Sequence, residues 1–473
     1  MITKSRPHLI ALGGLVLLLG GCASVPQKGG FEEVKTEVAN RTGHRVEWRQ
    51  SSDEDQALDR EVNALLEKSL TPESAVQIAL LNNRHLQATY EELGIAQANL
   101  VQAGLLSNPI FSAEIGFVEG GGSPDLLFGV TQNFLSILFQ PLRKSIAEAE
   151  FAAARQRVAA QAISIAADVC DAYYRFQADL QIGELLRQTV KATAASLEAA
   201  QTLREAGNTT ALQLYREQAL HEEARLLLAG AEGQAVADRE HLNRLMGVWD
   251  KQVVWRMPTR LPDVPSGMLD LTDLERRAIT ANLHLQALRS DLLAAARRAG
   301  LADRTDLIPD FEIGAGAERE EGAWDAGPSV AFTLPFFDQG QARKAAAYAE
   351  VRRLRQTYYA KGVDLRSMVR AAGHRVFNTR QRALHVANVV LPLRSRIVNE
   401  SQLQLNAMQL GVFDLLTAER QQINAALEYV ETRREYWEAR TRLQQILNGS
   451  MPMDMDGEDA SLALGTGMEA GGH

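Results

Sequence analysis

The sequence predicts a mainly α-helical protein with a transmembrane β-barrel, built from two tandem repeats of helix, β-hairpin, very long helix, turn and returning helix. Three observations predict this fold class. Two short stretches alternate apolar and polar side chains, a long stretch rich in helix-forming residues follows each of them, and the two halves match when the sequence is shifted against itself by 200 residues. Self-similarity at a fixed period identifies an internal repeat, which has to be recognised before any local pattern is interpreted.

The alternating stretches are predicted β-hairpins over residues 109–135 and 309–336. In the first hairpin, Phe111 and Ile115 fall on one face of the strand and Glu114 falls on the other, and the second hairpin keeps the same parity. A Gly-rich turn follows the first strand of each pair, and the alternation then resumes. Period-two alternation bounded by turn residues is typical of a β-hairpin.

The length of these strands points to a membrane. Roughly 10 residues with apolar and polar side chains on opposite faces are what a tilted strand needs to cross a bilayer. Two hairpins supply only four strands, whereas a bilayer tolerates no open sheet edge and about 8 strands is the least that closes. Neighbouring chains must complete the sheet, and three copies give 12 strands. On the strand pattern alone, two surface hairpins of a soluble sheet are an equal alternative.

The start of the chain predicts export. A short basic segment precedes the apolar run 9–19, so residues 1–21 are a predicted signal peptide. The tetrapeptide 19–22 resembles a bacterial lipobox, in which Cys22 is lipidated and becomes the mature N-terminus. Ala23 and Ser24 follow in place of the Asp that retains such lipoproteins in the inner membrane. The resemblance therefore implies sorting to the outer membrane, with an uncleaved anchor as the alternative.

Composition excludes several other classes of protein. The net charge of −9 argues against nucleic acid, which requires a basic surface. No apolar stretch after residue 22 reaches the roughly 18 residues of a membrane helix. His221-Glu222 begins like a zinc-protease motif, but Arg225 takes the place of the second histidine. We therefore predict no enzyme and no cofactor.

The predicted domains follow the repeat. They are a lipidated tether at 22–69 with one short helix, a first repeat at 70–247, a proline-containing linker at 248–269, a second repeat at 270–449 and a disordered tail at 450–473. Within the first repeat, a helix begins at Thr71-Pro72 and runs to about residue 106, because Thr suits the N-cap and Pro the first helical position. The matching helix of the second repeat covers about 271–306.

Each repeat then continues into a helical hairpin. The first long helix is predicted at 141–205 and returns at 212–246 after a polar turn; the second is predicted at 341–410 and returns at 415–448 after a turn at 411–414. Apolar residues of the first long helix recur alternately three and four positions apart, the period of a coiled-coil seam. Pro392 interrupts the second long helix, where a kink is expected.

The repeat architecture resembles the TolC family of outer-membrane efflux channels, and the lipobox points to its lipoprotein branch. The resemblance covers roughly residues 60–449, and the segment 414–420 is similar to the family's helix start after the turn. It implies a homotrimer with a 12-strand barrel in contact with outer-membrane lipid. It also implies a long α-helical tunnel that places most of the chain in the periplasm.

The function implied by this resemblance is passive conduction in a tripartite efflux system. Drugs or metal ions would pass from the periplasm to the exterior after the channel docks a periplasmic adaptor protein and an inner-membrane efflux pump. The alternative is that the chain is itself an adaptor lipoprotein, since such proteins also carry lipid anchors and helical hairpins. An adaptor normally has one hairpin flanked by several small β-domains, whereas this sequence predicts two hairpins and four strands.

The resemblance also assigns candidate site residues at the periplasmic tips. The expected adaptor contacts are Gly207, Asn208, Thr209, Gly411 and Val412. Asp414 matches the first of two aspartates that constrict the aperture in family members carrying both, and Thr417 occupies the second position. Three Asp414 carboxylates in a ring would attract cations to the mouth. The alternative is that Asp414 caps the returning helix.

The tail offers weak candidates for a metal site. Met451, Met453 and Met455 alternate with other residues near its start. Thioethers suit soft ions such as Cu(I) and Ag(I). A flexible polar tail that happens to contain methionine is the more common explanation of this pattern, and no other metal ligands are predicted.

Overall fold

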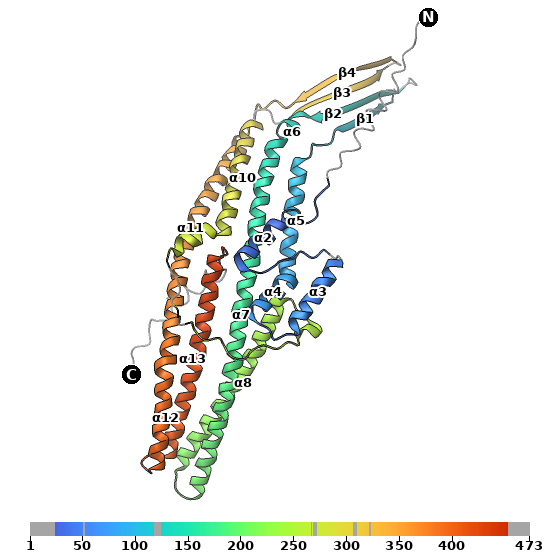
Figure 1. The fold of residues 1–473 in the computed structure, drawn as a ribbon. Coiled ribbons are helices and arrows are strands. Elements are labelled where there is room, and N and C mark those ends of the chain that lie inside the picture. Colours follow the sequence, from blue (N-terminus) through green and yellow to red (C-terminus); the bar gives the residue numbers. More distant parts are fainter. Residues whose placement is uncertain are drawn as a thin grey trace, which may run out of the picture. The chain divides into compact units, whose positions relative to one another are not determined.

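The computed structural model describes residues 24–50, 53–117, 124–265, 267, 272–305, 310–320 and 323–452 (Figure 1). These residues form two compact units. Unit 1 contains the described parts of 1–32, 91–156 and 286–359, and unit 2 contains those of 33–90, 157–285 and 360–473.

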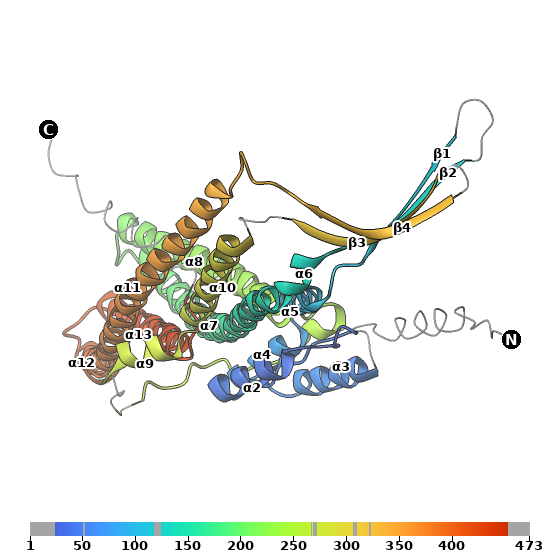
Figure 2. The same ribbon diagram turned by 90° about the horizontal axis from the view of Figure 1, so that it is seen from above.

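Unit 1 contains a single four-stranded antiparallel sheet. Its strands are β1 (Ile110–Gly116), β2 (Asp125–Asn133), β3 (Phe311–Glu320) and β4 (Ala323–Phe332), in the order β1-β2-β3-β4 (Figure 2). Both predicted hairpins are present, and pairing of β2 with β3 joins the two repeats. Strand β4 ends at Phe332, so the last residues of the predicted hairpin lie outside it. Within the described residues, β1 and β4 have no partner on their outer edges.

The strand register separates an apolar face from a polar face, because directly paired residues of antiparallel strands share a face. The apolar face carries Phe111, Ala113, Ile115, Leu126, Phe128, Val130, Phe311, Ile313, Ala315, Ala317, Trp324, Ala326, Pro328, Val330 and Phe332, with Gln132 and Arg319 among them. The opposite face is mainly polar and carries Ser112, Glu114, Asp125, Thr131, Glu312, Gly314, Glu318, Asp325 and Ser329, with Ile110, Leu127 and Ala331 among them. The rings of Phe111, Phe128 and Trp324 stack across the apolar face at centroid distances of 6.3 and 6.2 Å.

Helices of both repeats contribute to unit 1. They include parts of α5 (Arg84–Gly104), α7 (Gln140–Glu205), α10 (Leu283–Thr305) and α11 (Gln341–His385), together with α6 (Phe134–Leu138). Ile146 and Ala149 of α7 pack against Ala294 of α10. The small alanine side chains allow the two helices to approach closely.

Unit 2 is almost entirely helical. Its elements are α2 (Phe31–Thr42), which begins at the end of unit 1, α3 (Asp53–Leu66), α4 (Pro72–Asn82), α8 (Ala211–Met246), η2 (Asp250–Val253), α9 (Leu274–Ala281), η3 (Val386–Val390), α12 (Leu391–Asn406) and α13 (Val412–Leu447), with the remainder of α5, α7, α10 and α11. Of the predicted α7 seam, Ala166, Val169, Tyr173 and Phe176 are buried, whereas Leu180 is half-buried. Among the described helices, none is long and apolar enough to span a membrane.

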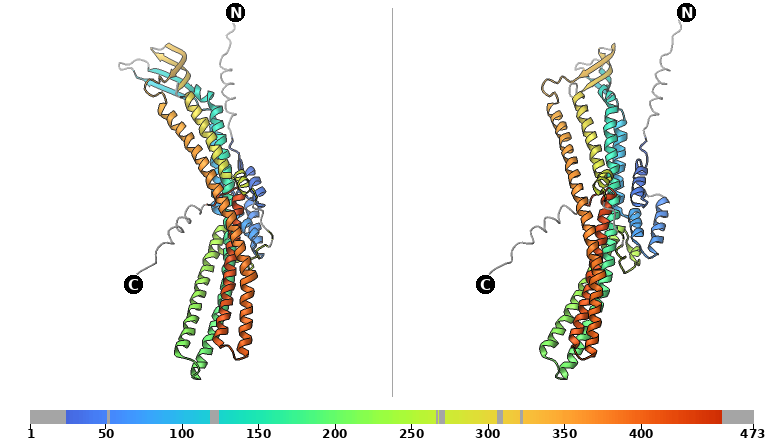
Figure 3. Two further views of the ribbon diagram at one scale, coloured as in Figure 1. Left: turned by 90° about the vertical axis from the view of Figure 1, so that its left-hand side faces the viewer. Right: turned by 60° about the vertical axis from the view of Figure 1, so that its left-hand side comes forward.

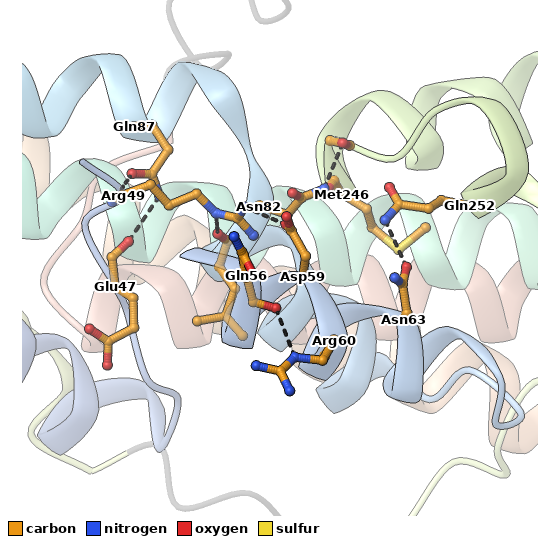
Figure 4. A network of polar contacts seen from close by, with 12 residues as sticks. Glu47, Arg49, Gln56, Asp59, Arg60, Asn63, Asn82, Gln87, Met246 and Gln252 are labelled. Atoms are coloured by element: carbon orange, nitrogen blue, oxygen red, sulfur yellow. Dashed lines mark hydrogen bonds and ion pairs between the residues drawn. The ribbon is translucent and has the colours of Figure 1, made fainter. Parts of the chain in front are cut away.

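The prediction of a tether with one short helix at 22–69 is wrong for the described part of this segment. It contains two helices, α2 and α3, and an extended stretch between them. Val38, Val46 and Trp48 are at most 2% exposed. The backbone N–H of Arg49 donates to Oε1 of Gln87 at 2.8 Å, as Figure 4 shows. Residues 33–50 and 53–66 are therefore packed within unit 2.

The first helix of each repeat is broken, whereas the sequence pattern predicted one continuous helix. Asn83 separates α4 from α5, and Asn282 separates α9 from α10, both in extended conformation. Oδ1 of Asn83 accepts from the N–H of Leu86 at 3.0 Å, and Oδ1 of Asn282 accepts from that of Leu285 at 2.8 Å. An asparagine that caps the next helix stabilises the break.

Each break packs against the glycine that closes its own repeat. Gly247 has φ +68°, and a Cβ there would lie 2.6 Å from the carbonyl oxygen of Asn82. Gly449 has φ +98°, and a Cβ there would lie 2.4 Å from the carbonyl oxygen of Ala281. Only glycine allows both the left-handed backbone and this close approach. Arg41 of α2 also donates to Ala281 O at 2.6 Å, so the N-terminal segment holds the second junction.

The predicted interruption near Pro392 is confirmed. The π-helical segment η3 comes directly before α12, and the N–H of Leu391 donates to the carbonyl oxygen of Val386, five residues earlier. A proline cannot donate its own N–H, and a π-helical turn is a known way to accommodate this within a long helix.

Candidate docking and aperture site

The first reverse turn at the predicted tips connects α7 to α8 in unit 2. Gly207 has φ +75°, and the N–H of Asn208 donates to the carbonyl oxygen of Leu203 at 2.8 Å, which closes α7. The side chain of Thr210 accepts from the N–H of Gln213 at 3.2 Å and so caps α8. The expected contact residues Gly207, Asn208 and Thr209 therefore form the turn itself, and the first two are exposed.

The second turn differs from the prediction. We expected a helix to residue 410 and a turn at 411–414, but α12 ends at Asn406 and α13 begins at Val412. Met408 has φ +60° and is 94% exposed, so the chain reverses before Gly411. Gly411 has an extended backbone and is the N-cap residue of α13. Val412 is consequently the first residue of a helix and not part of the turn.

The side chain of Asp414 explains this early start. Its Oδ2 accepts from the backbone N–H of Gly411 at 3.3 Å, which satisfies one of the free donors at the helix start. Thr417 donates its hydroxyl to the carbonyl oxygen of Phe413 at 2.7 Å and accepts from Arg420 at 3.1 Å. Both Asp414 and Thr417 are exposed. Asp414 is thus a helix cap, and the aperture ring remains a prediction.

A groove lies between the C-terminal part of α7 and the start of α13, within unit 2. It is open, has a volume of about 440 Å³ and is lined by Ala195, Glu198, Ala199, Thr202 and Leu203 of α7 and by Val412 of α13. Figure 3 shows the ends of the α7–α8 and α12–α13 hairpins near one another in both views. Two of the α7 residues that line the groove are alanines. Of the expected contact residues, Val412 lies in this groove.

A polar stripe on α13 was missed in the sequence. Asp414 and Thr417 are followed on the same exposed face by Gln421, Asn424, Glu428 and Glu431, at alternating spacings of three and four. The buried face of the same helix carries Leu415, Ala418, Ala425 and Val430. The heptad spacing of these uncharged polar and acidic residues is visible in the sequence and could have predicted the stripe.

Several predicted site residues cannot be placed. Cys22, Met453 and Met455 lie outside the described residues. Met451 is described, and it is only 9% exposed. The described residues contain no cluster of three or more His, Cys, Asp or Glu side chains that could hold a metal ion.

Several known proteins are similar to this chain in sequence or in fold. Residues 75–248 match the family model of outer membrane efflux proteins. The chain is 23% identical over 397 residues to the cobalt-zinc-cadmium resistance protein CzcC of Cupriavidus metallidurans, a match that covers 80% of this chain and 90% of CzcC. These matches confirm the resemblance to the TolC family of outer-membrane efflux channels that the sequence predicted.

One further relative and one solved structure are also similar to this chain. The chain is 24% identical to the multidrug resistance outer membrane protein MdtP of Escherichia coli over 329 residues, covering 65% of this chain and 67% of MdtP. Its fold is similar to the crystal structure of the outer membrane protein VceC of Vibrio cholerae, with a TM-score of 0.66 at 16% identity. That similarity covers 84% of this chain and 98% of VceC.

Proposed function

We propose that this chain is the outer-membrane channel of a tripartite efflux system and conducts drugs or metal ions passively from the periplasm to the exterior. The observation that carries this proposal is the sheet of unit 1. Its apolar face is exposed, with Phe111 66% and Val330 60% accessible, while its other face is polar. A sheet of this kind suits lipid on one side and water on the other.

The two open edges of the sheet support a homotrimer. Backbone N–H and C=O groups on the outer edges of β1 and β4 need partners in hydrocarbon. Pairing of β1 with β4 of a neighbouring copy satisfies both edges, and three copies close a barrel of 12 strands. The helices of unit 2 would then form a tunnel, with the polar stripe of α13 as its lining.

The partners we propose are a periplasmic adaptor protein and an inner-membrane efflux pump. The candidate surface that we propose for the adaptor comprises the exposed turn at Gly207, the cap at Gly411 and the groove beside Val412. The alternative that the chain is itself an adaptor is disfavoured, because the family match and the relatives are outer-membrane proteins. The chain also has two helical hairpins, α7–α8 and α12–α13, whereas an adaptor normally has one.

The names of the relatives support two substrate classes. CzcC is a cobalt-zinc-cadmium resistance protein, and MdtP is a multidrug resistance protein. We therefore keep metal ions and drugs as the proposed substrates. No catalytic role is proposed, since passive conduction requires none. The lipid on Cys22 would add an anchor in the outer membrane, with most of the chain in the periplasm.

Purification of the full chain in detergent tests this proposal. We expect native mass spectrometry to show three copies and planar bilayers to show ion conductance. A detergent-stable trimer that does not conduct would contradict the channel. A monomer that binds an outer-membrane channel would support the adaptor alternative instead.

A further inference from the structure

Each repeat closes at a junction where the ends of two helices meet. The first junction brings the end of α4, at Asn82, to the glycine that follows α8, Gly247. The second junction brings the end of α9, at Ala281, to the glycine that closes α13, Gly449. Each closing glycine approaches the carbonyl oxygen of the facing residue in the same way, and each facing residue directly precedes the asparagine that breaks its helix. Positions 82 and 281 are therefore equivalent.

The side chains at these two equivalent positions differ. Nδ2 of Asn82 donates to the carbonyl oxygen of Gly247 at 2.6 Å and to that of Met246 at 3.4 Å (Figure 4), so the first junction supplies its own donor. Ala281 has no hydrogen-bonding group in its side chain. The second junction therefore lacks the amide that links the two helix ends of the first.

A second bond of the first junction is also missing from the second. Nδ2 of Asn83 donates to the carbonyl oxygen of Leu245 at 2.7 Å. Nδ2 of the equivalent Asn282 is buried and has no hydrogen-bond partner in the described part of the chain. The second junction thus has fewer bonds from its own asparagines than the first, although the backbones of the two are alike.

Arg41 of α2 donates where this amide is missing. Its Nη1 donates to the carbonyl oxygen of Ala281 at 2.6 Å and to that of Asn448 at 2.8 Å. Asn448 directly precedes its closing glycine, as Met246 does in the first repeat. Nε and Nη2 of Arg41 lie 2.7 and 2.5 Å from Oε1 of Glu37, one helical turn earlier, so this carboxylate orients the guanidinium. The arginine side chain is only 17% exposed.

The two helix ends make this position favourable for a cation. Ala281 is the last residue of α9, and Asn448 is the C-cap residue of α13. The last carbonyl groups of a helix have no partner within it and carry the partial negative charge of the helix dipole. A hydrogen bond from a charged donor is also stronger than one between neutral groups. Arg41 therefore bridges two helix ends that would otherwise lack a common donor.

We propose that Arg41 takes the place of the donor that the second repeat lacks at Ala281, and that α2 is thereby a strap which holds the end of α13 against α9. Helix α13 begins at Val412, beside the groove of the candidate site, so the strap fixes the opposite end of that helix. The N-terminal segment is then a working part of the second repeat. The strap follows from the hydrogen bonds of the described residues and does not depend on the proposed channel function.

Hydrogen exchange of the full chain in detergent tests the strap, because the first junction is an internal control. Backbone amides in residues 282–287 and 445–450 report on the second junction, and those in 83–88 and 243–248 report on the first. We expect Arg41→Met to speed exchange at the second junction by about ten- to hundredfold, which corresponds to loss of a hydrogen bond to a charged group. Exchange at the first junction should stay unchanged.

A rescue variant and two controls assign the effect. Addition of Ala281→Asn to Arg41→Met should restore protection at the second junction, because an asparagine already serves at the equivalent position of the first. Asn82→Ala should speed exchange at the first junction and leave the second unchanged. Arg45→Met is the matched control on the N-terminal segment, since the side chain of Arg45 pairs with Glu61 at 2.5 Å, and it should leave both junctions protected.

The proposal is wrong if Arg41→Met leaves exchange at the second junction unchanged, or if it speeds exchange equally at both junctions. It is also wrong if the double variant exchanges as fast as Arg41→Met, since the new amide would then not replace the arginine. If Arg41→Met does not fold, thermal unfolding of the double variant decides the question. A double variant that folds supports the strap, and one that remains unfolded overturns it.

Discussion

At the scale of single residues, Asp414 caps α13, and the proposed cation ring at the aperture would give it a second, compatible role. Its Oδ2 accepts from the N–H of Gly411, and the side chain remains exposed on the polar stripe of α13. Capping needs only an acceptor oxygen, whereas attraction of cations needs the negative charge. A substitution that keeps the oxygen and removes the charge separates the two roles.

We expect Asp414→Asn to leave trimer formation unchanged and to weaken cation selectivity and block by multivalent cations in planar bilayers. The reason is that three like charges held in a ring focus cations at the mouth of a pore. Glu419→Gln is the control, because it removes a carboxylate from another face of the same helix. Selectivity and block equal to the unmodified channel would restrict Asp414 to capping.

The glycines that close the repeats give a second prediction at this scale. Gly247→Ala should destabilise the protein by about 2 kcal/mol or more, because its left-handed backbone costs a residue with Cβ about 1–2 kcal/mol and the new methyl would also collide with Asn82 O. A methyl group at Gly230, inside α8, would meet no neighbouring side chain within 4 Å, so Gly230→Ala should stabilise by about 0.5–1 kcal/mol. Thermal unfolding followed by circular dichroism measures both, and equal shifts would contradict the packing argument.

At the scale of elements, the proposal that the chain spans a membrane depends on the four-stranded sheet. Its strands expose an aromatic and aliphatic face that would be unfavourable in water, and they leave two edges unpaired within the described residues. The neighbouring positions Val330 and Ser329 of β4 point to opposite faces, since successive side chains of a strand alternate. The two positions are adjacent on one strand, so they would lie at a similar depth in the bilayer, and they differ in the face of the sheet that they occupy.

We expect Val330→Lys to reduce the amount of folded trimer in the outer membrane and Ser329→Lys to have little effect. A lysine on the lipid face costs about 2–4 kcal/mol at the bilayer midplane and less near the interface. Heat-modified electrophoresis of isolated outer membranes measures the folded fraction. Equal losses for the two variants would mean that the apolar face does not contact lipid.

At the scale of the whole molecule, the proposed channel has two attachments to the membrane. The barrel would span the bilayer, and the lipid on Cys22 would add acyl chains at the N-terminus. A single acyl chain gives only marginal and reversible membrane binding. The anchor is therefore expected to supplement a barrel that is already inserted.

We expect Cys22→Ser to abolish labelling by a fatty-acid analogue and to leave trimers and conductance intact. Radiolabelled or click-labelled protein from whole cells gives the first readout, and native mass spectrometry gives the second. Labelling that persists in the variant would place the lipid on another residue. Loss of trimers together with labelling would show that the anchor is required for assembly.

The sequence by itself determined the elements whose signal is local. Alternation of period two predicted both hairpins, and the apolar seam of the first long helix predicted the buried residues Val169 and Tyr173. Thr71 caps α4 as predicted, with its hydroxyl accepting from the N–H of Ser74 at 3.2 Å. In each case the physical cause acts between residues a few positions apart, so it can be read from spacing alone.

Only the tertiary structure decided the features that depend on distant partners. The breaks at Asn83 and Asn282 depend on glycines about 165 residues away, where the backbones approach too closely for any other residue. The N-terminal segment looked like a tether because its few apolar residues have a core to pack against only when unit 2 is folded.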